Sequence, residues 1–274
     1  MKLFCFGLGY SAQYLANELS STSWQYSGTH KSSGDFIFDG DSPLQNAKEI
    51  LQDVTHLLIS IAPDKNGNDL VLQHHKQDII NCPNLKWIGY LSATSVYGNH
   101  NGNWVDENTI PKPSDDRGKA RLNAEQQWLS LNLPVHIFRL GGIYGPNRNQ
   151  IAAVKNNTAQ KIIKKNQTFS RIHVHDICGA LMASIDHPQP KTIYNIVDDQ
   201  PTSSADVLDY ICHILKEPII KGTTIDQMTL SPTMQSFYND NKKVRNDIAK
   251  KELDWQLKFP NYKDGYADIL TKIN

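Results

Sequence analysis

A glycine-rich turn near the start of the chain constrains the fold more than any other feature. It reads G-x-G-x-x-A over residues 7–12, directly after the apolar run 3–6 and before a segment with helical spacing of apolar side chains. Gly7 permits a tight turn out of a strand, Gly9 lets a pyrophosphate approach the backbone, and Ala12 lets helix and strand pack closely. The helix N-terminus adds free N–H groups that favour phosphates. The turn therefore predicts a dinucleotide site; a turn without a ligand and a methyltransferase glycine loop are the alternatives.

Short apolar runs alternate with helical segments through the first 150 residues. Such alternation predicts an α/β protein whose doubly wound parallel sheet has helices on both faces, a Rossmann-type fold. The expected strands are 3–6, 24–29, 36–38, 56–62, 86–92 and 135–140, and the expected helices are 12–19, Ser42-Pro43 to Leu51, 69–80 and 118–131.

The alternation loosens after about residue 150. Residues 192–197 predict a late strand of the main sheet, and Ser203 is placed to cap a helix over 207–215. We expect residues 1–150 to form an NAD(P)-binding core. Residues 151–274 are expected to build mostly a small substrate-binding lobe, interleaved with the core and lying over the carboxyl edge of the sheet.

The end of the second predicted strand bears on the choice of cofactor. Thr29, His30 and Lys31 follow one another there without a carboxylate to accept from a ribose 2′-hydroxyl. A hydroxyl, an imidazole and an ammonium suit a 2′-phosphate, which predicts NADP with NAD as the alternative; Lys31 could also be a solvated loop residue. Asp39 could accept from the adenine amino group or cap a turn. The predicted cofactor-binding residues are Gly7, Gly9, Tyr10, Ser11, Ala12, Thr29, His30, Lys31, Asp39, Ile61, Ala62 and Ser92.

Four further motifs occur in a fixed order along the chain. They are S-A-T-S-V-Y-G at 92–98, R-L-G-G-I-Y-G-P at 139–146, I-H-V-H-D at 172–176, and N-K-K with P-N-Y-K-D-G at 241–243 and 260–265. With the glycine turn they resemble the extended short-chain dehydrogenases/reductases, which include the nucleoside-diphosphate-sugar epimerases and dehydratases. The G-x-G-x-x-A spacing differs from that group's usual G-x-x-G-x-x-G and indicates an atypical branch.

The reaction centre that the resemblance implies is altered. The family uses Tyr-x-x-x-Lys on the helix after the V-Y-G loop, together with a Ser or Thr. Here Arg117 and Arg121 stand at the tyrosine and lysine positions, and Ala93 stands at the hydroxyl position between Ser92 and Thr94. A guanidinium stays protonated at physiological pH and cannot act as a general base. Tyr97 and Tyr144 are the other candidates for proton transfer.

The arginines allow two interpretations. Residues four apart share a helical face, so Arg117 and Arg121 could bind a carboxylate or phosphate, with Thr94 polarising a substrate carbonyl. Alternatively both are surface charges, with Arg121 paired to Glu125 and Arg117 near Asp115 and its neighbour. The predicted reaction-centre residues are Thr94, Arg117 and Arg121.

Composition excludes several classes of partner. Basic and acidic residues number 28 each, so neither nucleic acid nor a membrane surface is an expected partner. The four cysteines form no C-x-x-C pair, which argues against a disulfide framework or zinc site and fits a reducing, cytoplasmic location. His173 and His175 alternate within I-H-V-H-D. We read that segment as a structural junction with Asp176 as a helix cap, and expect no metal.

These observations lead to one expected function and one alternative. We expect an NAD(P)-dependent oxidoreductase or nucleoside-diphosphate-sugar epimerase-like enzyme that lacks the usual Ser/Tyr/Lys centre. Its substrate would be a small molecule, anionic or a sugar nucleotide. The alternative is a non-catalytic NADP(H)-binding sensor or interaction protein. The resemblance also implies a homodimer formed through the helices predicted at 69–80 and 118–131.

Overall fold

A seven-stranded sheet lies at the centre of the computed structural model, which describes residues 1–64 and 66–272, with the backbone alone at 232 and 233. Its order is β11-β7-β5-β4-β1-β2-β3, and all neighbouring strands are parallel. The predicted doubly wound α/β fold is confirmed. The strands are β1 (Lys2–Phe6), β2 (Gln25–His30), β3 (Phe36–Ile37), β4 (His56–Ile59), β5 (Trp87–Ala93), β7 (Val135–Leu140) and β11 (Ile193–Ile196).

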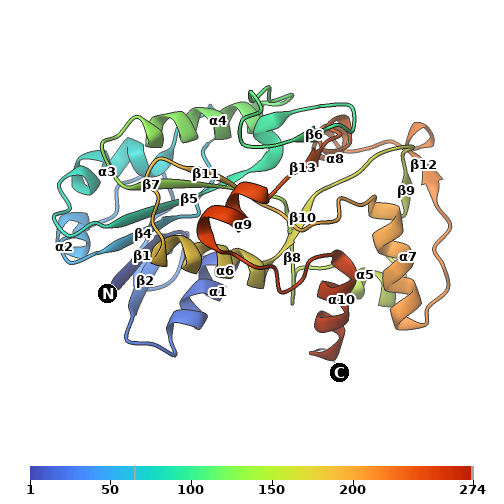
Figure 1. Cartoon of the computed structure of the whole chain (residues 1–274), viewed down its shortest axis with the longest axis horizontal. Coiled ribbons are helices and arrows are strands. Elements are labelled where there is room, and N and C mark those ends of the chain that lie inside the picture. Colours follow the sequence, from blue (N-terminus) through green and yellow to red (C-terminus); the bar gives the residue numbers. More distant parts are fainter. Residues whose placement is uncertain (65, 273–274) are drawn as a thin grey trace.

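Helices cover both faces of this sheet (Figure 1). One face packs against α1 (Tyr10–Leu19), α6 (Val174–Asp186) and α9 (Asp247–Leu253). The other face packs against α2 (Ala47–Leu51), α3 (Leu70–Ile80) and α4 (Asp116–Leu129). Because both faces are covered, the central strands are buried, including all four residues of β4 and all six of β7.

A buried polar contact joins α3 to α4. Asp69 caps α3 by accepting from Leu72 N at 2.9 Å, and its second oxygen accepts from Trp128 Nε1 at 2.9 Å. Trp128 lies on α4 and is fully buried. This contact fixes α4, the helix that carries Arg117 and Arg121, relative to the sheet.

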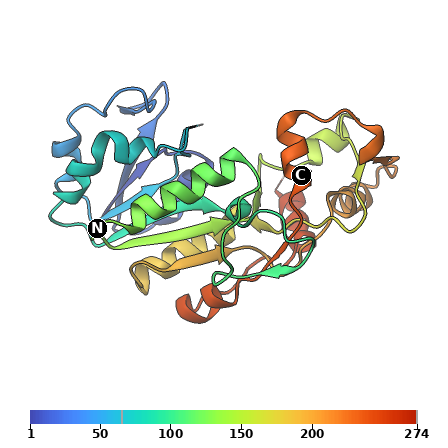
Figure 2. The same cartoon turned by 90° about the horizontal axis from the view of Figure 1, so that it is seen from above.

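A second group of elements, here called the lobe, lies beyond the carboxyl edge of the sheet, at the right of Figures 1 and 2. Tyr144, Ile151, Ile211 and Tyr266 belong to its buried cluster. Its helices are α5 (Ile151–Lys155), α7 (Ser204–Leu215), α8 (Pro232–Asn239) and α10 (Tyr262–Thr271). Three parallel two-stranded sheets accompany it: β8 (Gly142–Tyr144) with β10 (Arg171–His173), β9 (Ile162–Ile163) with β12 (Thr223–Thr224), and β6 (Trp104–Val105) with β13 (Lys243–Val244). Single 3₁₀ turns are η1 (Thr94–Tyr97) and η2 (Ile225–Gln227).

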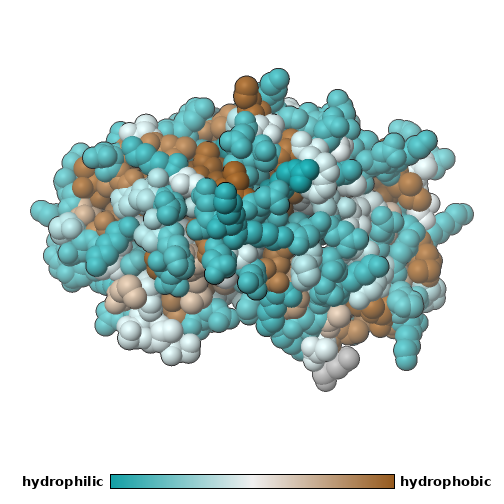
Figure 3. Space-filling view, viewed as in Figure 1, coloured by the Kyte–Doolittle hydropathy of each residue, from teal (hydrophilic) through white to brown (hydrophobic). Residues whose placement is uncertain are grey.

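Two local predictions had different outcomes. The cap at Ser203 is confirmed, since its Oγ accepts from Asp206 N at 3.0 Å. The helix expected to start at Ser42-Pro43 begins only at Ala47, because Ser42 N donates to Asp39 in a turn and Asn46 has a left-handed φ of 54°. The visible surface in Figure 3 is mostly hydrophilic, with scattered hydrophobic residues. Among the described helices, none combines the length and apolar character needed to span a bilayer.

Candidate functional site

The glycine turn is bonded to Thr29 of β2 and packs against Ile61, just after β4. Gly7 N donates to Thr29 Oγ1 at 2.9 Å, and Leu8 N donates to Thr29 O at 2.8 Å. Gly7 has a φ of +88°, and a Cβ there would lie 2.8 Å from Cγ1 of Ile61. Only glycine adopts this positive φ without strain and leaves room for the Ile61 side chain. The turn therefore lies at the switch point of the sheet, between the ends of β2 and β4.

Gly9 is constrained differently. It is the N-cap of α1 with a φ of −90°, and a Cβ there would meet no atom of the described chain within 4 Å. No described side chain caps this helix end, so the N–H groups of Tyr10, Ser11 and Ala12 remain available to a ligand. The open space beside Gly9 fits the approach of a pyrophosphate, as the sequence motif requires.

The residues at the end of β2 differ in role: Thr29 supports the glycine turn, whereas Lys31 is exposed to solvent. Thr29 is buried, and its hydroxyl accepts the Gly7 N–H. The His30 ring lies against Gly34, and Lys31 is exposed. Asp39 accepts from the backbone of Asp41 and Ser42; these N–H groups, and the charge of Lys31, hold the Asp39 pKa below its usual value. Lys31 is thus an exposed cation after β2, close enough to Asp39 for its charge to act on that carboxylate.

A buried network occupies the space beneath the V-Y-G loop. The Ser92 hydroxyl donates to Glu125, which pairs with Arg139 at 2.7 Å. Arg139 also donates to Tyr97 Oη at 3.0 Å, and Tyr97 donates to Asn195 Oδ1 at 2.8 Å. The suggested Arg121–Glu125 pair is therefore wrong, because Glu125 faces the core and Arg139 reaches it there.

The candidate tyrosines Tyr97 and Tyr144 are buried. Burial raises the pKa of Tyr97 to about 12, and both of its hydrogen-bonding partners belong to the core network. Burial likewise raises the pKa of Tyr144, whose ring stacks on Tyr266 at 5.3 Å between centroids. A raised pKa keeps both phenols protonated at neutral pH.

The arginines lie where the sheet edge faces the lobe. Arg121 Nη1 donates to Leu91 O at 2.8 Å, and its guanidinium lies 5.9 Å from the Tyr90 ring centroid. Arg117 is exposed one turn earlier, and no described carboxylate forms an ion pair with it. A Cβ on Gly118 would lie 2.8 Å from Ser95 O, so α4 packs closely on η1, which carries Thr94. Arg117, Arg121 and Thr94 line the same cavity.

That cavity has a volume of about 700 Å³ and opens between the carboxyl edge of the sheet and the lobe. Lys242 in its wall pairs with Asp240 at 3.1 Å, and Asp115 caps α4. Its remaining cations have no ion-pair partner among the described residues and are Arg117, Arg121, Arg148 and Arg171. The cavity is therefore electropositive and suits an anion.

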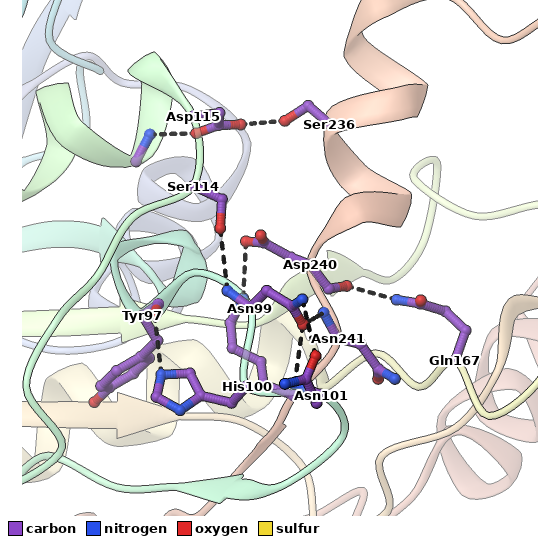
Figure 4. A network of polar contacts seen from close by, with 12 residues as sticks. Tyr97, Asn99, His100, Asn101, Ser114, Asp115, Gln167, Ser236, Asp240 and Asn241 are labelled. Atoms are coloured by element: carbon purple, nitrogen blue, oxygen red, sulfur yellow. Dashed lines mark hydrogen bonds and ion pairs between the residues drawn. The ribbon is translucent and has the colours of Figure 1, made fainter.

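Polar contacts missed by sequence reasoning attach α8 to the core (Figure 4). Ser236 on α8 donates to Asp115, the N-cap of α4. Just after α8, Asn241 N donates to Asn99 Oδ1 at 3.1 Å, and Asn241 O accepts from His100 N at 3.0 Å. Asn241 belongs to the N-K-K motif, so this motif was the feature of the sequence from which the contact could have been predicted.

The histidine segment has a structural role in the described residues. His173 is the N-cap of α6, its Nδ1 accepting from His175 N at 3.2 Å. The expectation that Asp176 caps this helix is wrong. Its carboxylate instead accepts from Lys258 N at 2.7 Å and from Phe259 N. Residues 1–64 and 66–272 contain no group of three or more His, Cys, Asp or Glu side chains placed to hold a metal ion.

The sheet order, the glycine turn and the lobe form a fold that is also found in a nucleotide-sugar epimerase solved with NAD. The UDP-glucuronic acid 4-epimerase of Bacillus cereus, solved with NAD, superposes with a TM-score of 0.79 over 100% of this chain and 99% of its own, at 15% identity. The resemblance to the extended short-chain dehydrogenases/reductases is thus confirmed for the fold.

Two other proteins are more similar to this chain in sequence. A conserved protein of unknown function from Silicibacter pomeroyi is 40% identical, with a TM-score of 0.92 over 99% of this chain and 98% of its own. This chain belongs to the same family as that protein. Protein YeeZ of Escherichia coli K12 is 29% identical over 217 residues, covering 71% of this chain and 77% of YeeZ. No family model matches the chain.

Proposed function

We propose that this chain is a nicotinamide-dinucleotide-dependent enzyme that acts on an anionic small molecule and prefers NADP to NAD. One observation carries the proposal. The glycine turn and the open space beside Gly9, together called the glycine cradle, lie at the switch point of the sheet, beside a cavity that Arg117 and Arg121 line from one helix. Parallel α/β folds bind ligands at this edge.

Several residues suit the parts of the cofactor. The turn from Gly7 to Ala12 would hold the pyrophosphate, with Ile61 and Ala62 beside it. Lys31 would meet the 2′-phosphate from its exposed position after β2. When bound, the nicotinamide supplies hydride exchange.

The cavity residues suit an anionic substrate, such as a sugar nucleotide or carboxylate. Arg121 is preorganised by Leu91 O and the Tyr90 ring, and Arg117, one turn earlier on α4, is exposed and would donate to the same anion. Thr94 directly follows Ala93 and lines the cavity together with Ser95, and its Oγ1 would donate to a substrate carbonyl. The arginines would bind and orient substrate rather than move a proton.

A non-catalytic NADP(H) sensor is the second candidate. The buried contact of Ser92 with Glu125 favours it, because that hydroxyl is occupied in the core and both Tyr and Lys are replaced. The two candidates share the cofactor site and differ only in whether the cavity supports hydride transfer.

The test uses NADPH with deuterium at nicotinamide C4 and a panel of carbonyl and sugar-nucleotide substrates. We expect deuterium in one product, abolished by Arg117→Ala or Arg121→Ala and kept in Lys119→Ala. Lys119 lies between them on α4, pairs with Asp116 and is outside the cavity, so it controls for lost charge. If the cofactor binds but deuterium enters no substrate, the sensor is the better description.

We further propose a cytoplasmic homodimer. The four cysteines are free and form no disulfide, as suits a reducing compartment. Helices α3 and α4 lie together on one face, and Ile80 at the end of α3 is 42% exposed. Light scattering at micromolar concentration should give twice the chain mass; a monomer would exclude the dimer.

A further inference from the structure

A tight turn after β8 presents one arginine in a fixed position. Gly145 N donates to Arg148 O at 3.0 Å, and Arg148 N donates to Gly145 O at 3.1 Å. Pro146 follows Gly145, and Asn147 has a φ of 60°, as the third position of a tight turn often requires. Asn149 Nδ2 adds a bond to Gly145 O at 2.9 Å.

This turn is attached to the first residue of α1. Tyr10 Oη donates to Pro146 O at 2.8 Å, and a Cβ on Gly145 would lie only 2.6 Å from Tyr10 Oη. The Arg148 guanidinium lies over the Tyr10 ring, 5.5 Å from its centroid. Its charge is therefore held at the helix end where Gly9 leaves open space.

Arg148 also lines the substrate cavity, and no carboxylate within the described residues forms an ion pair with it. It is thus positioned between the glycine cradle and the cavity. The backbone N–H groups of the glycine turn carry partial charges, whereas a guanidinium offers a full charge and two parallel donors that match phosphate oxygens.

We propose that Arg148 binds the pyrophosphate of the dinucleotide and closes the boundary between cofactor and substrate cavity. The inference rests on the proposed function, because it requires a dinucleotide in the cradle. It assigns a role to a residue that lies outside the glycine turn and 139 positions after Gly9 in the chain.

The test measures the dissociation constants of NADPH, NADH and ADP-ribose by fluorescence titration for the unaltered protein, Arg148→Gln and Arg245→Gln. Arg245 is the matched control: it is exposed, lies 4.9 Å from the Trp104 ring centroid, and is outside the cavity lining. We expect Arg148→Gln to weaken all three ligands by the same factor, about tenfold, because all three contain the pyrophosphate. Arg245→Gln should leave them unchanged, and thermal unfolding without ligand should be equal in the three proteins.

Each other result overturns the inference in a distinguishable way. A loss confined to NADPH would place Arg148 at the 2′-phosphate, and a loss that spares ADP-ribose would place it at the nicotinamide. Equal losses in both variants would show only a general effect of charge. Unchanged binding in Arg148→Gln refutes the inference and leaves the proposed function intact, whereas an unaltered protein that binds no dinucleotide refutes both.

Discussion

Gly7 and Gly9 should respond to alanine in opposite ways. At Gly9 the φ of −90° is available to any residue, and a Cβ would meet no described atom within 4 Å. Alanine lowers the entropy of the unfolded chain but is a poorer N-cap than glycine, so the two effects oppose each other. Gly9→Ala should therefore change the free energy of unfolding by less than about 1 kcal/mol.

At Gly7 the φ of +88° strains any other residue, and a Cβ would lie 2.8 Å from Ile61 Cγ1 and 2.9 Å from Ser60 Oγ. Holding a non-glycine residue in such a conformation costs about 1–3 kcal/mol, and the contact with Ile61 adds to this. Gly7→Ala should thus lower the free energy of unfolding by at least about 2 kcal/mol.

Urea unfolding and NADPH titration of both variants check this reasoning. Gly9→Ala should fold normally yet bind NADPH at least about tenfold more weakly, because the methyl group occupies the place where the pyrophosphate approaches. Gly7→Ala should instead unfold at a lower urea concentration than Gly9→Ala and the unaltered protein. Unaltered NADPH affinity in a stable Gly9→Ala protein would refute the assignment of the open space to a phosphate.

Three further predictions concern charges. Glu125→Gln leaves the Arg139 guanidinium buried without its partner, so the free energy of unfolding in urea should fall by about 3 kcal/mol; a loss under about 1 kcal/mol would contradict the pairing. Burial raises the pKa of Asp198 from 3.8 to about 8, so the folded state retains a proton that the unfolded state releases, and stability declines as pH rises across that interval. Asp198→Asn should remove this part of the decline, as urea unfolding at pH 5 and pH 8 would show, and an unchanged pH dependence would count against it. Lys31→Ala should weaken NADPH and leave NADH nearly unchanged, so equal effects on both would argue against a 2′-phosphate contact.

The core of the fold could be predicted because its signals are local. The strand expected at 135–140 coincides with β7, and the late strand near 192–197 contains β11. The sheet of β6 and β13 was not foreseen. It pairs Trp104 with Lys243, and strands of two residues so far apart in sequence leave no periodic pattern to read.

The candidate site was harder to predict because its contacts are tertiary. The spacing of Arg121 and Glu125 suggested a helical ion pair, yet Glu125 lies on the buried side of α4 with Ala124 and Trp128. The apolar residues beside Glu125 could be read from the sequence. Arg139, the partner of Glu125, comes from β7 and could be found only from the fold.

Calorimetric titration of the unaltered protein with NADPH tests the central claim most directly. The account predicts saturable binding at one site per chain, tighter for NADPH than for NADH, with no binding of S-adenosylmethionine. Failure of both dinucleotides to bind would contradict the account and leave only the fold.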